Sequence, residues 1–102
     1  MKLVIGNRQK EINRNDFEKI TEGFGRVEID LGTGDGRFIF KNALLSPDTL
    51  FIGIDPSEKQ LEIYSKKAVR RKLKNTLFVV GSVENFPSEL FSSANRIYVI
   101  LQ

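Results

Sequence analysis

The residues that could do chemistry lie at the ends of two apolar runs, each of which ends in a carboxylate. The first run leads through Asp30 into a glycine-rich segment that contains Gly32, Gly34 and Gly36, and the second run ends at Asp55. Each run is typical of a short buried strand, and glycine permits both a tight turn and the close approach of a ligand to the backbone. This order of strand, glycine loop, helix, strand and acid is typical of a site for a nucleoside-bearing cofactor.

The details favour S-adenosylmethionine over a dinucleotide. The dinucleotide signature has the spacing G-x-G-x-x-G, whereas the three glycines here are spaced G-x-G-x-G. Asp30 would repel a pyrophosphate but suits the ammonium group of a methionine moiety, and Asp55 can accept hydrogen bonds from both ribose hydroxyls of an adenosine. The alternative is that the acids only cap helices and the glycines only form a turn. Two acids at matching strand ends favour the cofactor site over that alternative.

Composition argues against several other kinds of chemistry. The 102 residues, one domain or less, contain no cysteine and no histidine. Disulfides and thiolate metal sites are therefore excluded, and the commonest general base and metal ligand is missing, so we expect no metal. Methyl transfer needs neither residue, because a sulfonium leaves readily and the main task is positioning. No apolar run approaches the roughly 20 residues that span a bilayer, so we expect a cytoplasmic protein without a membrane partner.

Around these residues the pattern predicts alternating strands and helices. A β-hairpin is expected first, with strands over residues 3–5 and 10–12 around a turn over residues 6–9. Further strands are expected over residues 27–31, 49–55, 76–80 and 96–101, and helices over residues 16–22, 38–45, 57 to about 73, and 87–90. This alternation predicts an α/β fold whose four main strands are parallel in the order 3-2-1-4, with the ligand above their carboxyl ends.

We expect the sequence to be the amino-terminal part of a longer domain. Its last residues fall inside or just after the predicted fourth strand, which would be central in a complete fold of this kind. An apolar strand edge left unpaired at this point favours self-association through the fourth strand.

Two motifs carry a resemblance to a known family. They are Ile-Asp-Leu-Gly-Thr-Gly-Asp-Gly-Arg over residues 29–37 and Phe-Ile-Gly-Ile-Asp-Pro over residues 51–56. The chain resembles the 16S ribosomal RNA adenine-N1 methyltransferases that confer aminoglycoside resistance, from the hairpin to the fourth strand. The resemblance implies a Rossmann-like, S-adenosylmethionine-dependent core, truncated here to residues 15–102 and preceded by a hairpin extension over residues 1–14. It also implies adenine N1 in the decoding site of 16S rRNA, within the 30S subunit, as the target.

The resemblance further implies contacts to both ends of S-adenosylmethionine. Asp30 would hold the methionine end together with the backbone of the loop. Asp55 would accept from the ribose hydroxyls, with Pro56 beside the adenosine. The loop residues that would contribute backbone groups are Gly32, Thr33 and Gly34.

Three later residues complete the set of cofactor contacts that the resemblance implies. Val83 would offer a backbone amide and an apolar wall to the adenine, and Glu84 would accept from its exocyclic amine. The alternative is that Val83 belongs to the core and Glu84 to a solvated helix start. Ile100 falls where the family places a strand-end carbonyl beside the methionine.

One departure from the family concerns the target base. In the family the fourth strand continues into Pro-Trp-Gly, and the tryptophan stacks on the flipped adenine. This sequence has Leu101 and Gln102 at that point and no tryptophan anywhere. Because a flipped base must be held by stacking in a pocket, we expect no methyltransferase activity from these 102 residues alone.

A basic run over residues 65–74 is the strongest charge feature, in a chain with a net charge of +3. On a helix, Lys66, Arg70 and Lys74 would form one row, and Lys67 and Arg71 another beside it. Like charges at this spacing cost a few tenths of a kcal/mol per pair, so the run indicates a use such as contacts to phosphate. The family docks a lysine-rich patch at this place onto ribosomal RNA, which implies Lys66, Lys67, Arg70 and Arg71 here. The alternative is that cations near a helix C-terminus only complement the helix dipole.

Two other functions stay open at this point. The chain could belong to another Rossmann-like RNA methyltransferase, such as a transfer-RNA guanine-N7 enzyme. It could also be a non-catalytic RNA-binding or oligomerising module, in which the glycine loop is vestigial and the basic helix is the functional part.

Overall fold

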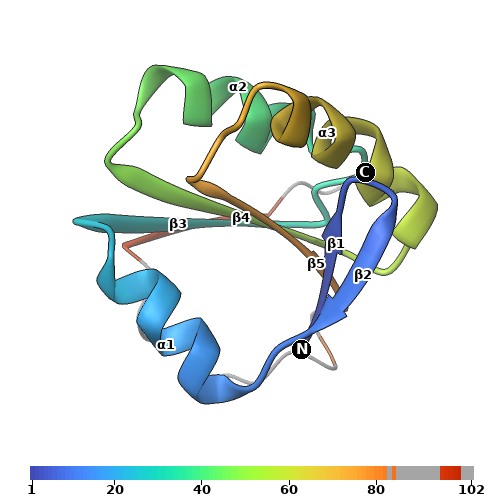
Figure 1. Cartoon of the computed structure of the whole chain (residues 1–102), viewed down its shortest axis with the longest axis horizontal. Coiled ribbons are helices and arrows are strands. Elements are labelled where there is room, and N and C mark those ends of the chain that lie inside the picture. Colours follow the sequence, from blue (N-terminus) through green and yellow to red (C-terminus); the bar gives the residue numbers. More distant parts are fainter. Residues whose placement is uncertain (83, 85–94, 100–102) are drawn as a thin grey trace.

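The computed structural model describes residues 1–82, 84 and 95–99, and within them a six-stranded sheet lies between two layers of helices (Figure 1). The strands are β1 (Lys2–Ile5), β2 (Arg8–Glu11), β3 (Arg26–Leu31), β4 (Thr49–Asp55), β5 (Thr76–Val80) and β6 (Arg96–Val99). The helices are α1 (Arg14–Glu22), α2 (Arg37–Leu45) and α3 (Glu58–Arg70). Helix α1 covers one face of the sheet, and α2 and α3 cover the other (Figure 1).

The strand order is β2-β1-β5-β4-β3-β6. Strands β5, β4, β3 and β6 pair in parallel, so the four main strands lie in the order expected from the sequence. The sheet as a whole differs from the expectation, because β1 pairs antiparallel with β5 and makes the sheet mixed. Leu3 and Val4 account for this pairing, since they are buried on opposite faces and extend both hydrophobic cores beyond β5.

The hairpin turn is shorter than expected. Gly6 has φ +65° and forms a two-residue turn with Asn7, so β2 begins at Arg8. A positive φ at the first turn residue alone is typical of the type II′ turn, whose twist matches that of the flanking strands. The expected turn over residues 6–9 is therefore wrong by two residues.

Helix α1 has well-defined ends. The side chain of Asn13 accepts a hydrogen bond from the backbone N–H of Asp16 at 2.8 Å, and Asp16 accepts from the backbone of Asn13 at 3.2 Å. This capping box makes Asn13 the N-cap of the helix. Gly23 ends the helix, as expected.

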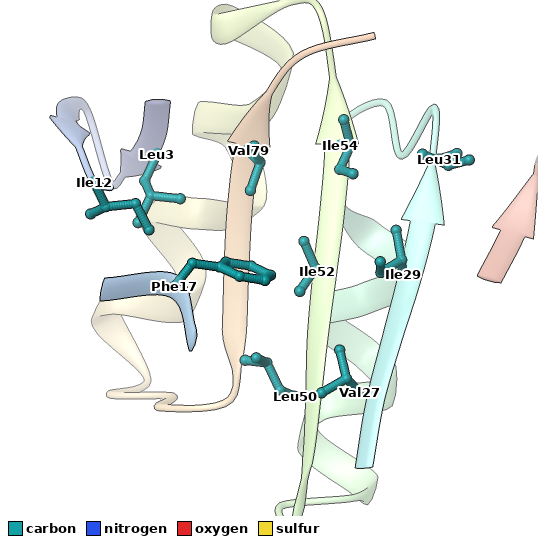
Figure 2. Close-up of a cluster of buried hydrophobic side chains, with 10 residues drawn as sticks. All are labelled: Leu3, Ile12, Phe17, Val27, Ile29, Leu31, Leu50, Ile52, Ile54 and Val79. Atoms are coloured by element: carbon teal, nitrogen blue, oxygen red, sulfur yellow. The ribbon is translucent and has the colours of Figure 1, made fainter. Parts of the chain in front are cut away.

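Two hydrophobic cores fix the sheet from both sides. On the α1 side, Phe17 packs against alternate residues of the strands (Figure 2). Figure 2 shows this cluster: Leu3, Ile12, Phe17, Val27, Ile29, Leu31, Leu50, Ile52, Ile54 and Val79. On the α2 and α3 side the buried cluster comprises Val4, Ile39, Ala43, Phe51, Leu61, Ala68 and Phe78. Strand β4 contributes to both clusters and β3 to the cluster on the α1 side, and this close packing fixes the positions of their carboxyl ends.

Helix α3 ends three residues before the expected position. Lys72 has φ +56°, in the left-handed region. Its N–H donates to the carbonyl of Val69 at 3.0 Å, and that of Leu73 donates to Ala68 at 3.0 Å. These two bonds form a Schellman motif, in which Leu73 turns back onto the core. Lys74 therefore lies beyond the helix, and its expected place in the basic row is wrong.

Some of the predicted elements lie outside the residues that the structure describes. The predicted short helix over residues 87–90 lies outside the described residues, as do residues 100 and 101 of the predicted fourth strand. In the described ranges, no helix has the length and apolar character needed to cross a membrane. The same ranges contain no cluster of three or more acidic side chains arranged to hold a metal ion.

Candidate cofactor site and basic surface

Asp30 and Asp55 lie at the same end and on the same face of the sheet. Strands β3 and β4 are parallel, and Asp30 is paired with Gly53 in their register. Since side chains alternate along a strand, Asp55, two residues after Gly53, projects to the same face as Asp30. Gly53 faces α2, because a Cβ placed on it would lie 2.9 Å from Ile39 of that helix. The two carboxylates therefore sit on neighbouring strand ends beside the start of α2.

Asp30 is a buried carboxylate with one unsatisfied oxygen. Its residue is 1% exposed, and its Oδ2 accepts a hydrogen bond from the Thr33 hydroxyl at 2.8 Å. Its Oδ1 has no hydrogen-bond partner among the described residues. Burial raises the pKa of Asp30 above its ordinary value, and the Thr33 hydrogen bond acts in the opposite direction. A buried polar atom without a partner is unusual in a native fold and is typical of a functional position.

Backbone bonds hold the glycine loop (residues 32–36) against the end of β4. The N–H groups of Gly32 and Thr33 donate to the carbonyl of Ile54 at 2.8 and 2.9 Å. Gly34 donates to Oδ2 of Asp55 at 3.0 Å. The side chain of Asp55 is thus both a predicted ligand and part of the support of the loop.

Asp55 also supports the start of α3. Its Oδ1 accepts from the backbone N–H of Ser57 at 2.9 Å, and Ser57 is the N-cap of the helix. Each carboxylate oxygen has two lone pairs, so Asp55 retains the capacity to accept two hydroxyls in addition to these backbone bonds. Pro56 precedes the cap and is exposed.

The glycines of the loop have different roles. Gly36 has φ +85°, and a Cβ on it would collide with the ring of Phe78 in the core. Gly36 therefore permits close packing of the start of α2 on the sheet. Gly34 has φ +62°, and no atom lies within 4 Å of the place where its Cβ would be. Gly34 is half-buried and Gly32 is exposed, so this side of the loop is open to a ligand.

The predicted adenine contacts are only partly described. Glu84 is an exposed residue in a turn after β5. Val83 and Ile100 lie outside the described residues. The described part of the chain thus brings together the residues that were predicted for the methionine and ribose ends.

The polar groups of the site fit S-adenosylmethionine. A buried carboxylate oxygen without a partner is chemically suited to an ammonium group, and Asp55 offers acceptor capacity for the ribose. The neighbouring backbone of the loop is free of side chains at Gly32 and Gly34.

The four predicted RNA contacts form an exposed basic surface on the last turns of α3. They are Lys66, Lys67, Arg70 and Arg71. Lys67 Nζ lies 4.4 Å from the centre of the Tyr64 ring, a cation–π contact. Within residues 1–82, 84 and 95–99, none of these four cations has a carboxylate within ion-pair distance. Their charge is therefore not neutralised by this part of the protein.

Comparison with known proteins identifies the family. Residues 2–101 match the NpmA family model, which is described as 16S rRNA (adenine(1408)-N(1))-methyltransferase. The chain belongs to this family.

Two relatives show how much of such a protein the chain covers. An Escherichia coli 16S rRNA (adenine(1408)-N(1))-methyltransferase is 36% identical over 104 residues, which is 98% of this chain and 48% of the relative. The crystal structure of a 30S ribosomal A1408 methyltransferase from an uncultured bacterium is 46% identical with a TM-score of 0.94, and the match covers 100% of this chain and 50% of that one. This methyltransferase-family chain therefore spans about half the length of the relatives it matches, and it shares their α/β fold.

Two more distant proteins also match the chain over most of its length. A 16S rRNA (adenine(1408)-N(1))-methyltransferase from Catenulisporales acidiphilia, solved as the W203A mutant with its cosubstrate SAM, is 24% identical with a TM-score of 0.86 over 97% of this chain and 46% of that one. At this identity the likeness concerns the fold. A tRNA (guanine-N(7)-)-methyltransferase from Chlorobium phaeobacteroides is 29% identical over 94% of this chain and 46% of the relative.

One residue that joins the hairpin to α3 was not predicted from the sequence. Ser65 is buried; its hydroxyl donates to the carbonyl of Val4 at 2.9 Å and accepts from the N–H of Gly6 at 2.8 Å. The sequence did contain a signal, because Ser65 occupies the apolar face of α3 between Leu61 and Ala68. A polar residue at a core-facing position needs a partner, and here the partner is the hairpin backbone.

A second contact joins the hairpin to the start of α3. Lys2 forms an ion pair with Glu58 at 2.8 Å, and Gln9 donates to the same carboxylate. The ammonium of Lys2 lowers the pKa of Glu58, and Glu58 raises the pKa of Lys2. Both side chains are partly exposed, so the pair contributes little to stability and mainly orients the hairpin.

Proposed function

We propose that this chain is the cofactor-binding part of an S-adenosylmethionine-dependent methyltransferase with a Rossmann-like core, acting on adenine N1 in the decoding site of 16S rRNA. The observation that carries the proposal is the buried, unsatisfied Oδ1 of Asp30 beside Asp55 at one sheet end. Membership of the family supports the reaction and the 30S subunit as partner. An enzyme that acts on the 30S subunit would work in the cytoplasm, and aminoglycoside resistance would follow from the same modification.

The proposed site acts by positioning. S-adenosylmethionine would supply a methyl group on a sulfonium, which leaves readily without a metal or a covalent intermediate. Asp30 would bind the ammonium group through Oδ1, while Thr33 holds Oδ2 in place. Asp55 would accept from the ribose hydroxyls, with Pro56 beside the adenosine. The backbone of Gly32 and Gly34 would border the methionine end, and Val83, Glu84 and Ile100 keep their proposed roles at the adenine and the methionine.

We propose that these 102 residues bind the cosubstrate but do not methylate RNA. The sequence contains no tryptophan, so the stacking residue that the family resemblance places after the fourth strand is not among them. A flipped base without a stacking partner would not be held at the methyl donor. Incorporation of labelled methyl groups into 30S subunits by the purified chain would contradict this proposal.

The basic surface of α3 would dock on ribosomal RNA. Its cations lack carboxylate partners in the described part of the chain, which supports contacts to phosphate over a role confined to the helix dipole. Self-association through β6 also stays a prediction, supported by the position of β6 at the end of the strand order.

A second candidate function is methylation of transfer RNA at guanine N7. The likeness to the Chlorobium phaeobacteroides enzyme favours it, since the match covers 94% of this chain. A binding module without catalysis is the remaining alternative. Methylation of the two RNAs by a longer protein containing this chain would separate the enzymatic candidates.

Calorimetric titration with S-adenosylhomocysteine tests the proposed cofactor site. We expect binding by the unmodified chain and loss of binding in Asp55→Ala, because the ribose then loses its acceptor. Asp48→Ala is the matched control, since Asp48 is an exposed loop carboxylate in the turn before β4. Asp55→Asn keeps one acceptor oxygen and should bind more weakly than the unmodified chain. Absence of binding by the unmodified chain, with a cooperative thermal transition that shows it is folded, would favour the non-catalytic module.

A further inference from the structure

Two hollows flank the last turns of α3, and both are lined by cations. The hairpin hollow, of about 320 Å³, is lined by Gly6, Asn7, Lys66, Val69 and Arg70. The α2 hollow, of about 300 Å³, is lined by Phe40, Lys67, Arg70 and Arg71. Lys66 lines only the first hollow, Lys67 and Arg71 line only the second, and Arg70 lines both.

The hairpin hollow has a rigid wall. The β1–β2 turn is fixed to α3 where Ser65 bonds to both Val4 and Gly6. Asn7, the second residue of this turn, is exposed and lines the hollow together with Lys66 and Arg70. The turn therefore presents Asn7 in a preformed position, which lowers the entropic cost of binding a ligand there.

The chemistry of this hollow is that of a phosphate site. Lys66 and Arg70 supply charge, and neither has a carboxylate within ion-pair distance in the described part of the chain. The side-chain amide of Asn7 supplies neutral N–H donors, which commonly position phosphates in nucleic-acid complexes. Val69 adds an apolar lining that does not compete for a charged ligand.

We propose that the β1–β2 turn is a second contact to RNA, in which the hairpin hollow takes one backbone phosphate between Asn7, Lys66 and Arg70. The inference rests on the proposed docking of α3 on ribosomal RNA and extends it across the helix. One strand of RNA would place phosphates in both hollows, with Arg70 between them. The hairpin, which the sequence presented as an extension, would then be part of the substrate-binding surface.

The test compares variants of the chain in binding to purified 30S subunits over a range of salt concentrations. Asn7→Asp places a negative charge in the hairpin hollow and should weaken binding at low salt by roughly fivefold. The slope of the logarithm of the binding constant against the logarithm of the salt concentration should become shallower by about one unit. Asn7→Lys should strengthen binding and steepen the slope. The control is Asn15→Asp, an exposed residue in the first turn of α1, on the opposite face of the sheet, which should leave both quantities unchanged.

A separate double variant tests the docking of α3 itself. Lys67→Glu with Arg71→Glu changes only the α2 hollow. If it weakens binding while Asn7→Asp and Asn7→Lys behave like the control, the hairpin contact is overturned and the proposed docking stands. If the double variant is without effect, or the unmodified chain does not bind 30S subunits, the docking of α3 and the hairpin contact both fail.

Discussion

At the scale of the residue, Asp30 is the position where stability and function oppose each other. Its carboxylate is buried, one oxygen has no partner in the described structure, and burial raises the pKa of Asp30. A group whose pKa is higher in the folded state than in the unfolded state lowers the free energy of unfolding once the pH rises above the unfolded value. The fold therefore contains a destabilising buried carboxylate at the place where a cationic group of a ligand would stabilise it.

Asp30→Asn should stabilise the free protein and abolish binding of S-adenosylhomocysteine. Removing the buried charge should raise the free energy of unfolding at pH 7 by about 1 kcal/mol, which is several degrees in melting temperature. Below its unfolded pKa, Asp30 is protonated in both the folded and the unfolded state. The difference in the free energy of unfolding between the variant and the unmodified chain should therefore shrink as the pH falls from the raised pKa of Asp30 to its unfolded pKa. Thermal melting at several pH values measures this, with the exposed Asp48→Asn as control. A variant that is less stable than the unmodified chain at pH 7 would contradict the argument.

The two acids of the site could be predicted from the sequence, but their surroundings could not. Asp30 and Asp55 each end an apolar run, and that pattern placed them at neighbouring strand ends. The hydroxyl of Thr33 on Asp30 and the N–H of Gly34 on Asp55 depend on the path of a five-residue loop. Such bonds are set by backbone torsions that glycine leaves open, so no spacing rule predicts them.

At the scale of the element, α3 shows that a pattern of basic residues does not predict where a helix ends. The spacing of the basic residues extended the helix to about residue 73, but a single left-handed residue, Lys72, ends it at Arg70. Apolar Leu73 decides the outcome, because it packs on the core only when the chain turns back. Packing of one side chain thus overrides the helix propensity of several lysines.

Lys72→Gly should stabilise the protein. A left-handed conformation costs an L-residue roughly 1–2 kcal/mol, and glycine adopts it without that cost, although it loses more entropy on folding. The net gain in the free energy of unfolding should be about 0.5 kcal/mol, measured by urea denaturation. Lys74→Gly, which removes the same charge without a positive φ, should be neutral or slightly destabilising. Equal effects of the two substitutions would show that the backbone of Lys72 is not strained.

At the scale of the whole molecule, α3 joins the two proposed sites. Its first turn is held by Asp55 through Ser57, and its last turns carry the basic surface about 20 Å away. The hairpin contacts this helix at its first residue, Glu58, and near its middle, at Ser65. The order of the parallel strands could be predicted from the alternation of elements, whereas the pairing of β1 with β5 could not, because Leu3 and Val4 fit either an isolated hairpin or a sheet edge.

The central claim is that Asp30 and Asp55 bind opposite ends of one S-adenosylmethionine molecule. The most direct test is a crystal structure of the chain bound to S-adenosylhomocysteine. The account predicts the amino group of the ligand within hydrogen-bond distance of Asp30 Oδ1, and the ribose hydroxyls on the carboxylate of Asp55. A ligand bound elsewhere, or one whose ribose and amino group contact neither carboxylate, would contradict it.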